Sequence, residues 1–231
     1  MPRSVSKRRT CRNNRKRPPG RFFGYLLLVL ILLGGAGMPG ALAQKRVVKT
    51  LLEPEIRDIA IDGSQCFAIS LETARTDRVT VEASMEGEYQ SEVVVQTENA
   101  GSTLMIRTGF TPGFDYPNDK LGAHKVLSVR LRVVLPEGQR VRLSAGRCQV
   151  EASGSYELLD VHIESGGCRM DHRATTTRVQ TFSAPITARI EEGDVSAESR
   201  HGKVRVDPIP GGDPSYELKS HLGDIRVHAG R

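Results

Sequence analysis

The amino-acid sequence predicts an all-β fold in which short strands stack in successive coils, a β-solenoid-like roll. Between residues 144 and 227 a five-residue phrase recurs, in which a small residue is followed by two apolar residues at every second position. This alternation has the two-residue period of a half-buried strand. The chain also lacks a heptad pattern and a long amphipathic helix pattern. The phrase occurs as Gly146–Val150, Gly166–Met170, Ala184–Ala188, Gly193–Ala197, Gly202–Val206 and Gly223–Val227.

The first 43 residues read as a secretory signal peptide. A basic head is followed by the apolar run Tyr25–Leu33 and by Ala41-Leu42-Ala43, which matches an A-x-A cleavage site. The competing interpretation is an uncleaved anchor with its basic end in the cytoplasm. Glycines and a proline interrupt the segment before about 20 apolar residues accumulate, which favours cleavage and no stable membrane span afterwards.

The net charge depends on this leader. The whole chain carries 33 basic and 27 acidic residues, a net charge of +6. The first 43 residues hold nine basic and no acidic residues, so residues 44–231 have a net charge of −3. A nucleic-acid partner is therefore not expected, because it would need a basic face.

Residues 44–231 fit a single domain. After a lead-in over Lys45–Glu55, five strand-like runs are separated by turn residues, and the last two flank Asn99–Gly101 as a hairpin. We expect these N-terminal strands, with Leu131–Leu135, to be continuous with the repeats. The five runs are Ile56–Ile61, Cys66–Leu71, Val79–Ala83, Val93–Thr97 and Leu104–Thr108.

Residues 109–124 form one long irregular segment that contains Phe110, Phe114 and Tyr116. Long loops in compact domains often carry function. These rings are a candidate contact loop for a glycan or a protein partner. The alternative, which we favour, is that they cover an edge or an open end of the sheet.

The repeats predict a coil of about 20 residues that holds two strands. The inward residues of successive coils would form ladders along a narrow core, namely Cys148, Cys168, Ile186, Val204 and Ile225. An antiparallel β-sandwich with hairpins of even length is the alternative. The regular recurrence of the phrase favours the solenoid-like roll.

Three phrases carry a resemblance to a known family. Ser165-Gly166-Gly167, Glu192–Val195 and Leu222–Val227 resemble the repeats of bacterial adhesin-like domains, the DUF4097-like and auto-transporter adhesin head (GIN) groups. The run Leu131–Gly138 resembles the strand and Pro-x-Gly step that precedes those repeats. The resemblance spans roughly residues 56 to 227. It implies a single-stranded right-handed β-helix in the cell envelope and no catalytic signature.

The cysteines leave two alternatives open. Cys148 and Cys168 occupy the same phrase position one coil apart, which could bring them within disulfide range in an oxidising compartment. They could equally be two small buried thiols. Cys66 is then an odd, buried thiol.

No pattern in the sequence assigns a catalytic, cofactor or metal site. A polysaccharide-cleaving enzyme would need paired carboxylates, one of them with a raised pKa. The candidates are Asp160, Glu164 and Asp171, or Glu191, Glu192 and Asp194. Most fall at outward positions or in turns, where acidic residues are solvated.

We therefore expect an exported, non-catalytic domain of the periplasm or cell surface. It would act as an adhesin-like interaction or structural module, without a cofactor, for an unidentified envelope protein or glycan. The alternatives are an envelope enzyme acting on polysaccharide, or a membrane-tethered sensor domain if the leader is retained.

Overall fold

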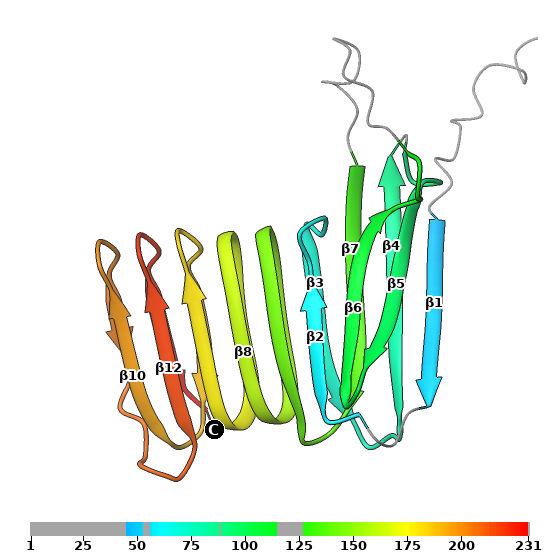
Figure 1. The fold of residues 1–231 in the computed structure, drawn as a ribbon. Coiled ribbons are helices and arrows are strands. Elements are labelled where there is room, and N and C mark those ends of the chain that lie inside the picture. The colour runs from blue at the N-terminus through cyan, green and yellow to red at the C-terminus, as the bar shows by residue number, and fades with distance from the viewer. Residues whose placement is uncertain (1–44, 53–55, 88, 115–126, 231) are drawn as a thin grey trace, which may run out of the picture. The chain divides into compact units, whose positions relative to one another are not determined.

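A computed structural model describes residues 45–52, 56–87, 89–114 and 127–230, which belong to one compact unit. These residues form an all-β structure of thirteen strands that join in one mixed sheet (Figure 1). The described part contains no helix, and therefore none long enough to cross a membrane. The expected signal peptide lies outside the described residues.

Six of the first seven strands, β2 to β7, correspond to the runs expected from the sequence. They are β1 Lys45–Leu52, β2 Asp58–Asp62, β3 Ala68–Ala74, β4 Arg78–Gly87, β5 Val93–Ala100, β6 Thr103–Phe110 and β7 Leu127–Pro136. The β5–β6 hairpin is confirmed, because the two strands pair antiparallel from Val93↔Phe110 to Ala100↔Thr103. The expected lead-in is instead strand β1, which pairs antiparallel with β4.

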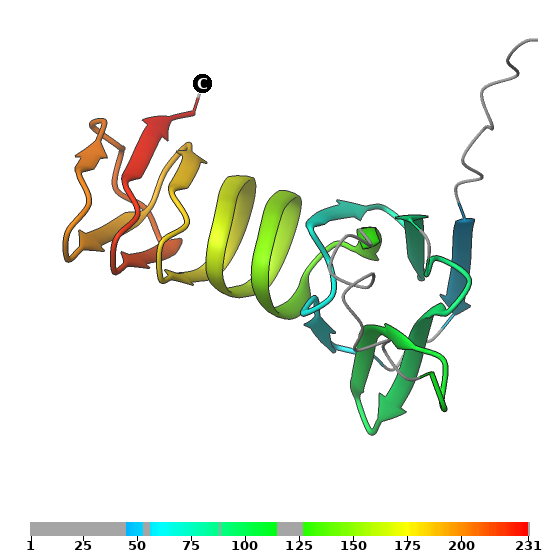
Figure 2. The same cartoon turned by 90° about the horizontal axis from the view of Figure 1, so that it is seen from above.

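The remaining strands contain the repeats. They are β8 Gln139–Thr181, β9 Ile186–Ile190, β10 Asp194–Ser199, β11 Val204–Val206, β12 Ser215–Ser220 and β13 Ile225–Ala229. The extended segment β8 winds through successive coils, as the view from above shows (Figure 2). It pairs in parallel with β2 and β3 on one side, and with β9 and β12 on the other. The N-terminal strands are thus joined to the repeats in one sheet, as expected.

The core is one continuous apolar cluster between the strands. The expected ladder residues Cys148, Cys168, Ile186 and Ile225 are buried. The parallel register places Cys168 beside Ile186 and Ile186 beside Ile225, so the same inward position recurs from coil to coil. Apolar side chains at every second residue therefore produce the ladder because each coil repeats the pleat of the previous one.

Val204 does not fit the expected ladder. It is paired with Ile225 in register but is 39% exposed, and Val206 on the same strand is 45% exposed. The reason is the order of the coils. β12 lies between β8 and β10, and β13 lies between β9 and β11. The last segment of the chain is therefore an inner coil, and the segment before it, with Val204, is the outermost one.

Loop residues 207–214 make this exchange of order feasible. Asp207 N donates to Val227 O, and Gly193 N donates to Pro210 O at 2.9 Å. Asp194 N donates to Pro214 O at 2.7 Å, at the start of β10. The loop thus leaves the outer coil, runs along it, and returns the chain to the inner position. The more apolar strands, with Leu218 and Ile225 fully buried, take that inner position.

Candidate functional site

Three stacked corners, which connect the strands of three neighbouring coils, present the most distinctive surface of the described residues. Each corner has four residues, with a hydroxyl first and a small residue last: Thr181–Ala184, Ser199–Gly202 and Ser220–Gly223. The hydroxyls hold the turns, because Gly202 N donates to Ser199 Oγ at 2.9 Å and Gly223 N donates to Ser220 Oγ at 2.8 Å. Such local side-chain bonds fix tight turns.

The corners also bond to one another. Thr181 Oγ1 lies 2.9 Å from Ser220 Oγ and donates to Ala184 O at 2.7 Å. Ser199 Oγ donates to Gly223 O at 2.8 Å. A Cβ at Gly223 would overlap the carbonyl oxygen of Ala184, so this position requires glycine for close backbone approach. The three corners are therefore held in one rigid stack.

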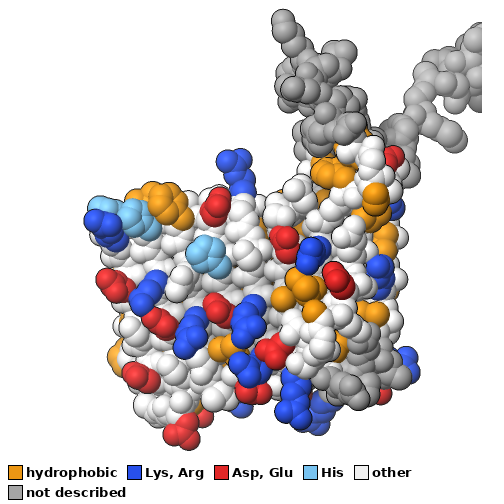
Figure 3. All heavy atoms as spheres, in the orientation of Figure 1, with side chains coloured by type: hydrophobic (Ala, Val, Ile, Leu, Met, Phe, Trp, Pro, Cys, Tyr) orange, Lys and Arg blue, Asp and Glu red, His pale blue; other side chains and the backbone are white. Residues whose placement is uncertain are grey.

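Five of the six middle residues of these corners form a surface that we call the corner patch: Phe182, Arg200, His201, His221 and Leu222. The Phe182 ring stacks on the His221 ring at 5.1 Å between centroids and an interplanar angle of 11°. The rings of His201 and His221 meet edge to face at 5.3 Å. Phe182 is 57% exposed and Leu222 is 46% exposed. Figure 3 shows histidine, basic and apolar side chains gathered at one upper edge of the surface.

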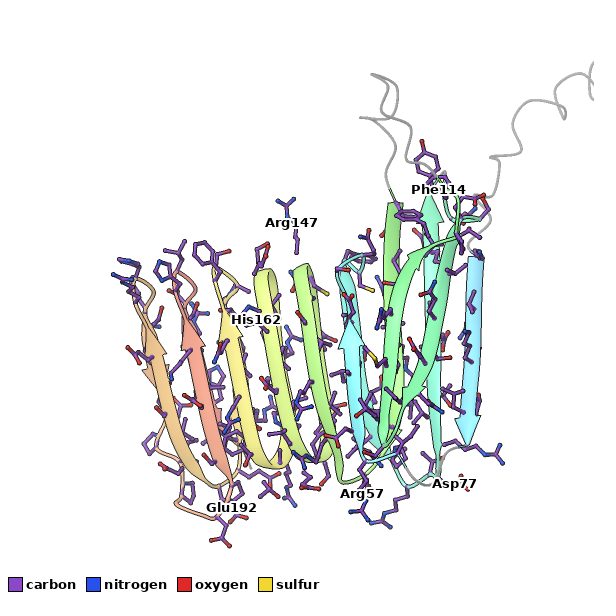
Figure 4. All side chains as sticks on the ribbon, viewed as in Figure 1. Arg57, Asp77, Phe114, Arg147, His162 and Glu192 are labelled. Carbon is purple, nitrogen blue, oxygen red and sulfur yellow. The ribbon has the colours of Figure 1, made fainter. Side chains whose placement is uncertain are left out.

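A groove of about 630 Å³ begins at this patch and continues over the strands. Its lining combines the Phe182 and His221 rings with polar side chains from β8 and β12. Figure 4 shows His162 on the same face of the stacked strands. The groove is lined by His162, Glu164, Gln180, Thr181, Phe182, Lys219, Ser220 and His221. The arrangement offers an aromatic surface beside several hydrogen-bond donors and acceptors.

The charge in the groove is largely compensated. Lys219 pairs with Glu217 on the same strand, and Arg178 lies 3.7 Å from the other oxygen of that carboxylate. The hydrogen bond from Lys219 lowers the pKa of Glu217 from its ordinary value. The groove therefore has mixed polarity and no strong single-sign field, which suits a polar, uncharged ligand.

Some of the carboxylates considered for catalysis share a hollow: Asp171 and Glu191 line one, and Glu191 and Glu192 line another. Asp171 lies 3.4 Å from Arg189, and Glu191 pairs with Arg173 on the exposed surface. Among the described carboxylates, only Glu72 and Glu217 have shifted pKa values, and both pKa values are lowered, by Arg132 and by Lys219 respectively. A glycoside-cleaving acid requires the opposite shift. Among the described residues, no group of three or more His, Cys, Asp or Glu could hold a metal ion.

The predicted contact loop is only partly described. The rings of Phe110 and Phe114 stack at 5.0 Å, and Phe114 meets Tyr89 edge to face at 5.3 Å. Phe110 also packs against the core. Figure 4 places Phe114 at the open end of the β5–β6 hairpin, opposite its turn. Tyr116 lies outside the described residues, so the loop as a contact surface stays a prediction.

Cys66, Cys148 and Cys168 are free, buried thiols. Burial raises the pKa of Cys66 to about 11 and that of Cys148 to about 12, and it also raises the pKa of Cys168. A Cβ at Gly166 would overlap the backbone of Cys148. The residue that stacks on Cys148 is therefore Gly166, which lies two positions before Cys168 in the sequence. The Cys148–Cys168 disulfide stays a prediction.

The corner patch and the groove were not expected from the sequence. A usable signal was present, since a hydroxyl residue followed three positions later by glycine or alanine occurs in all three corners. The repeat phrase begins at that small residue, so it describes the strand after the corner and not the corner itself. The stacking of Phe182 on His221 depends on the order of the coils, which the sequence does not give.

Comparison with known proteins adds information about the fold. No known family profile matches the chain, and no curated protein matches its sequence. A solved structure of a candidate cell adhesion protein from Clostridium sporogenes is 14% identical with a TM-score of 0.56, over 81% of this chain and all of that one. This likeness supports the all-β fold alone.

Two further solved structures are candidate adhesins. The one from Parabacteroides distasonis is 15% identical with a TM-score of 0.41, over 80% of this chain and 82% of that one. The one from Parabacteroides merdae is 12% identical with a TM-score of 0.37 over the same shares. Scores this low add nothing to the fold assignment.

Proposed function

We propose that this chain is an exported, non-catalytic, adhesin-like binding module of the periplasm or cell surface. Residues 1–43 are its signal peptide, and residues 44–231 form one domain whose coils wind as a right-handed β-helix. The basic head, apolar run and A-x-A site support export. The parallel pairing of successive coils supports the β-helix. The likeness to a candidate cell adhesion protein agrees with a binding role.

We further propose that the ligand is a carbohydrate chain bound along the groove at the corner patch. The main observation in support is the exposed Phe182 ring, which is stacked on His221 beside a polar groove. The apolar face of a sugar ring packs on an aromatic side chain. Its hydroxyls can bond to Glu164, Gln180 and His162, which line the same groove. Three rigid corners hold this surface in place without an ordering cost on binding.

The proposal is tested by screening the purified chain on an array of bacterial and host oligosaccharides, and by titrating the best binder calorimetrically. Phe182→Ala should weaken binding roughly tenfold, about 1.4 kcal/mol, because it removes the stacking surface. Phe67→Ala is the matched control, since Phe67 is also exposed but lies beside Arg130, away from the groove. Absence of any glycan binding, or equal affinities for both variants, would contradict the proposal.

The predicted contact loop is a second candidate surface, with a protein partner. Phe110 and Phe114 stack on each other at the open end of the β5–β6 hairpin. Tyr116 follows Phe114 by two residues in the sequence. Changing Phe114 and Tyr116 together to alanine separates the two candidates. If the loop binds the partner, this double variant loses binding in a pull-down while Phe182→Ala retains it.

A further inference from the structure

The outermost coil exposes a cross-section of the core. β10 and β11 each pair with one strand, β12 and β13, and their other edges carry no strand among the described residues. The inward columns nevertheless continue to this end: Val195 and Ala197 follow Tyr216 and Leu218, while Val204 and Val206 follow Ile225 and Val227. Unpaired edges of this kind are templates for another strand, and repeat proteins ordinarily cap them with polar residues.

The opposite end of the sheet is protected. Edge strand β1 places Lys45 and Lys49 opposite Met85 and Val81, on the inward face. Lys45 Nζ also donates to the carbonyls of Ser91 and Val93, both at 2.9 Å, and so bridges from β1 toward β5. Inward-pointing charges are a recognised means of blocking edge-to-edge pairing. β10 and β11 have no inward charge, so this end of the described sheet is suited to strand pairing.

The charges on the outermost coil indicate which partner can bind to its open edges. The outward residues of β10 include Asp194 and Glu198, whereas β11 and the residue before it carry Arg205 and Lys203. In register, Asp194 lies opposite Ser215 of β12 and Arg205 lies opposite Arg226 of β13, while Glu198 lies opposite Lys219 of β12. One strand of the open coil is thus acidic and the other is basic, so the coil is complementary to itself when β10 of one copy meets β11 of another.

We propose that two copies of this chain associate end to end through their outermost coils, with a two-fold axis parallel to the strands. β10 and β11 run in opposite directions on the two sides of the coil. This axis therefore brings β10 of each copy antiparallel to β11 of the other, with inward faces matched. Val195 and Ala197 of one copy then stack on Val204 and Val206 of the other.

The other two-fold arrangement pairs each strand with itself. It would bring Asp194 and Glu198 of one copy close to Asp194 and Glu198 of the other copy. It would also bring the two copies of Arg205 close to each other. Like charges across an antiparallel pair are destabilising. The isologous arrangement with unlike strands is closed, so it ends at two copies and not in a filament.

Reciprocal charge reversal tests the proposal with the full chain. Sedimentation velocity at tens of micromolar should give two copies per particle. Arg205→Glu and Glu198→Lys should each weaken dimerisation at least tenfold, because each opposes like charges in both strand pairs. An equimolar mixture of the two variants should restore the dimer, since one strand pair is then native and the other is fully reversed. Arg107→Glu on β6 is the control and should remain dimeric.

Restoration in the mixture also excludes misfolding as the cause of the single-variant defects. Three results would overturn the proposal: a wild-type chain that sediments as a single copy, assemblies that grow beyond two copies with concentration, or a mixture that stays monomeric. None of these outcomes depends on the carbohydrate groove, so the two proposals fail or succeed separately.

Discussion

His172 is the most unusual residue of the described core, because it is a buried titratable group among apolar side chains. Its ring lies between Tyr156 and Tyr216, with centroids at 5.7 and 6.0 Å, and its Nε2 lies 2.8 Å from Thr177 Oγ1. Its Nδ1 has no hydrogen-bond partner among the described residues. Burial lowers the pKa of His172 from 6.5 to about 4, against a smaller opposing effect of Asp171.

This pKa makes a prediction about acid stability. Between pH 6.5 and about 4 the unfolded chain binds a proton at His172 and the folded chain does not. The stability due to neutral His172 is therefore present above pH 6.5 and lost as the pH falls, by up to about 3 kcal/mol. His172→Gln should show a smaller loss of unfolding free energy than the parent between pH 7.5 and 4.5, as measured by urea unfolding.

The exposed His162, on the same extended segment, provides the control. His162→Gln should retain the acid sensitivity of the parent chain, because the His162 side chain is exposed and lies outside the core. If His172→Gln and the parent lose equal stability on acidification, the carboxylates and not His172 account for the acid sensitivity.

At the scale of the elements, the corners determine which strands can stack. Gly166 has φ = 115°, a region that side chains rarely adopt, and a Cβ there would overlap the carbonyl of Cys148 on the neighbouring coil. Glycine is thus required both for its backbone conformation and for the close approach of two coils. The small residue of the repeat phrase is a packing requirement as well as a turn signal.

Substitution at this corner should be costly. Gly166→Ala should lower the free energy of unfolding by about 3 kcal/mol, because the strain and the overlap cannot both be relieved without separating the coils. Gly109→Ala is the matched control, since nothing lies within 4 Å of its added Cβ, and it should change stability by less than about 0.5 kcal/mol. Equal thermal midpoints for the two variants would contradict this account.

At the scale of the whole described unit, the chain order and the spatial order of the last two coils differ. β12 and β13 come last in the sequence but lie between the body of the sheet and the outer strands β10 and β11. The outer coil therefore depends on residues that follow it in the chain. This arrangement also creates the open end with its acidic and basic strands.

Truncation tests this order. Removal of residues 207–231 should abolish hydrogen-exchange protection in residues 194–206, because these strands lose their pairing partners. Removal of Gly230 and Arg231 alone should leave that protection unchanged. If the longer truncation preserves protection over 194–206, the outer coil must pair directly with β8 and β9, as simple sequential stacking predicts.

The sequence by itself determined the class of the fold and most of its strands. Alternating apolar residues identify β2–β6 and the repeats, because a pleated strand with one buried face imposes a two-residue period whatever its neighbours are. The same local pattern identified Ile186 and Ile225 as core residues. It did not identify β1, whose basic residues at Lys45 and Lys49 interrupt the apolar alternation.

Only the tertiary structure decided which coil is outermost and which side chains meet at the corners. Val204 and Ile225 have the same local pattern, but one is 39% exposed and the other fully buried. Their difference arises from competition for the inner position, which depends on the summed burial of whole strands and on the loop that lets the chain return. The contact of Phe182 with His221 has the same origin: residues 39 apart become neighbours because the last coil is inserted against β8.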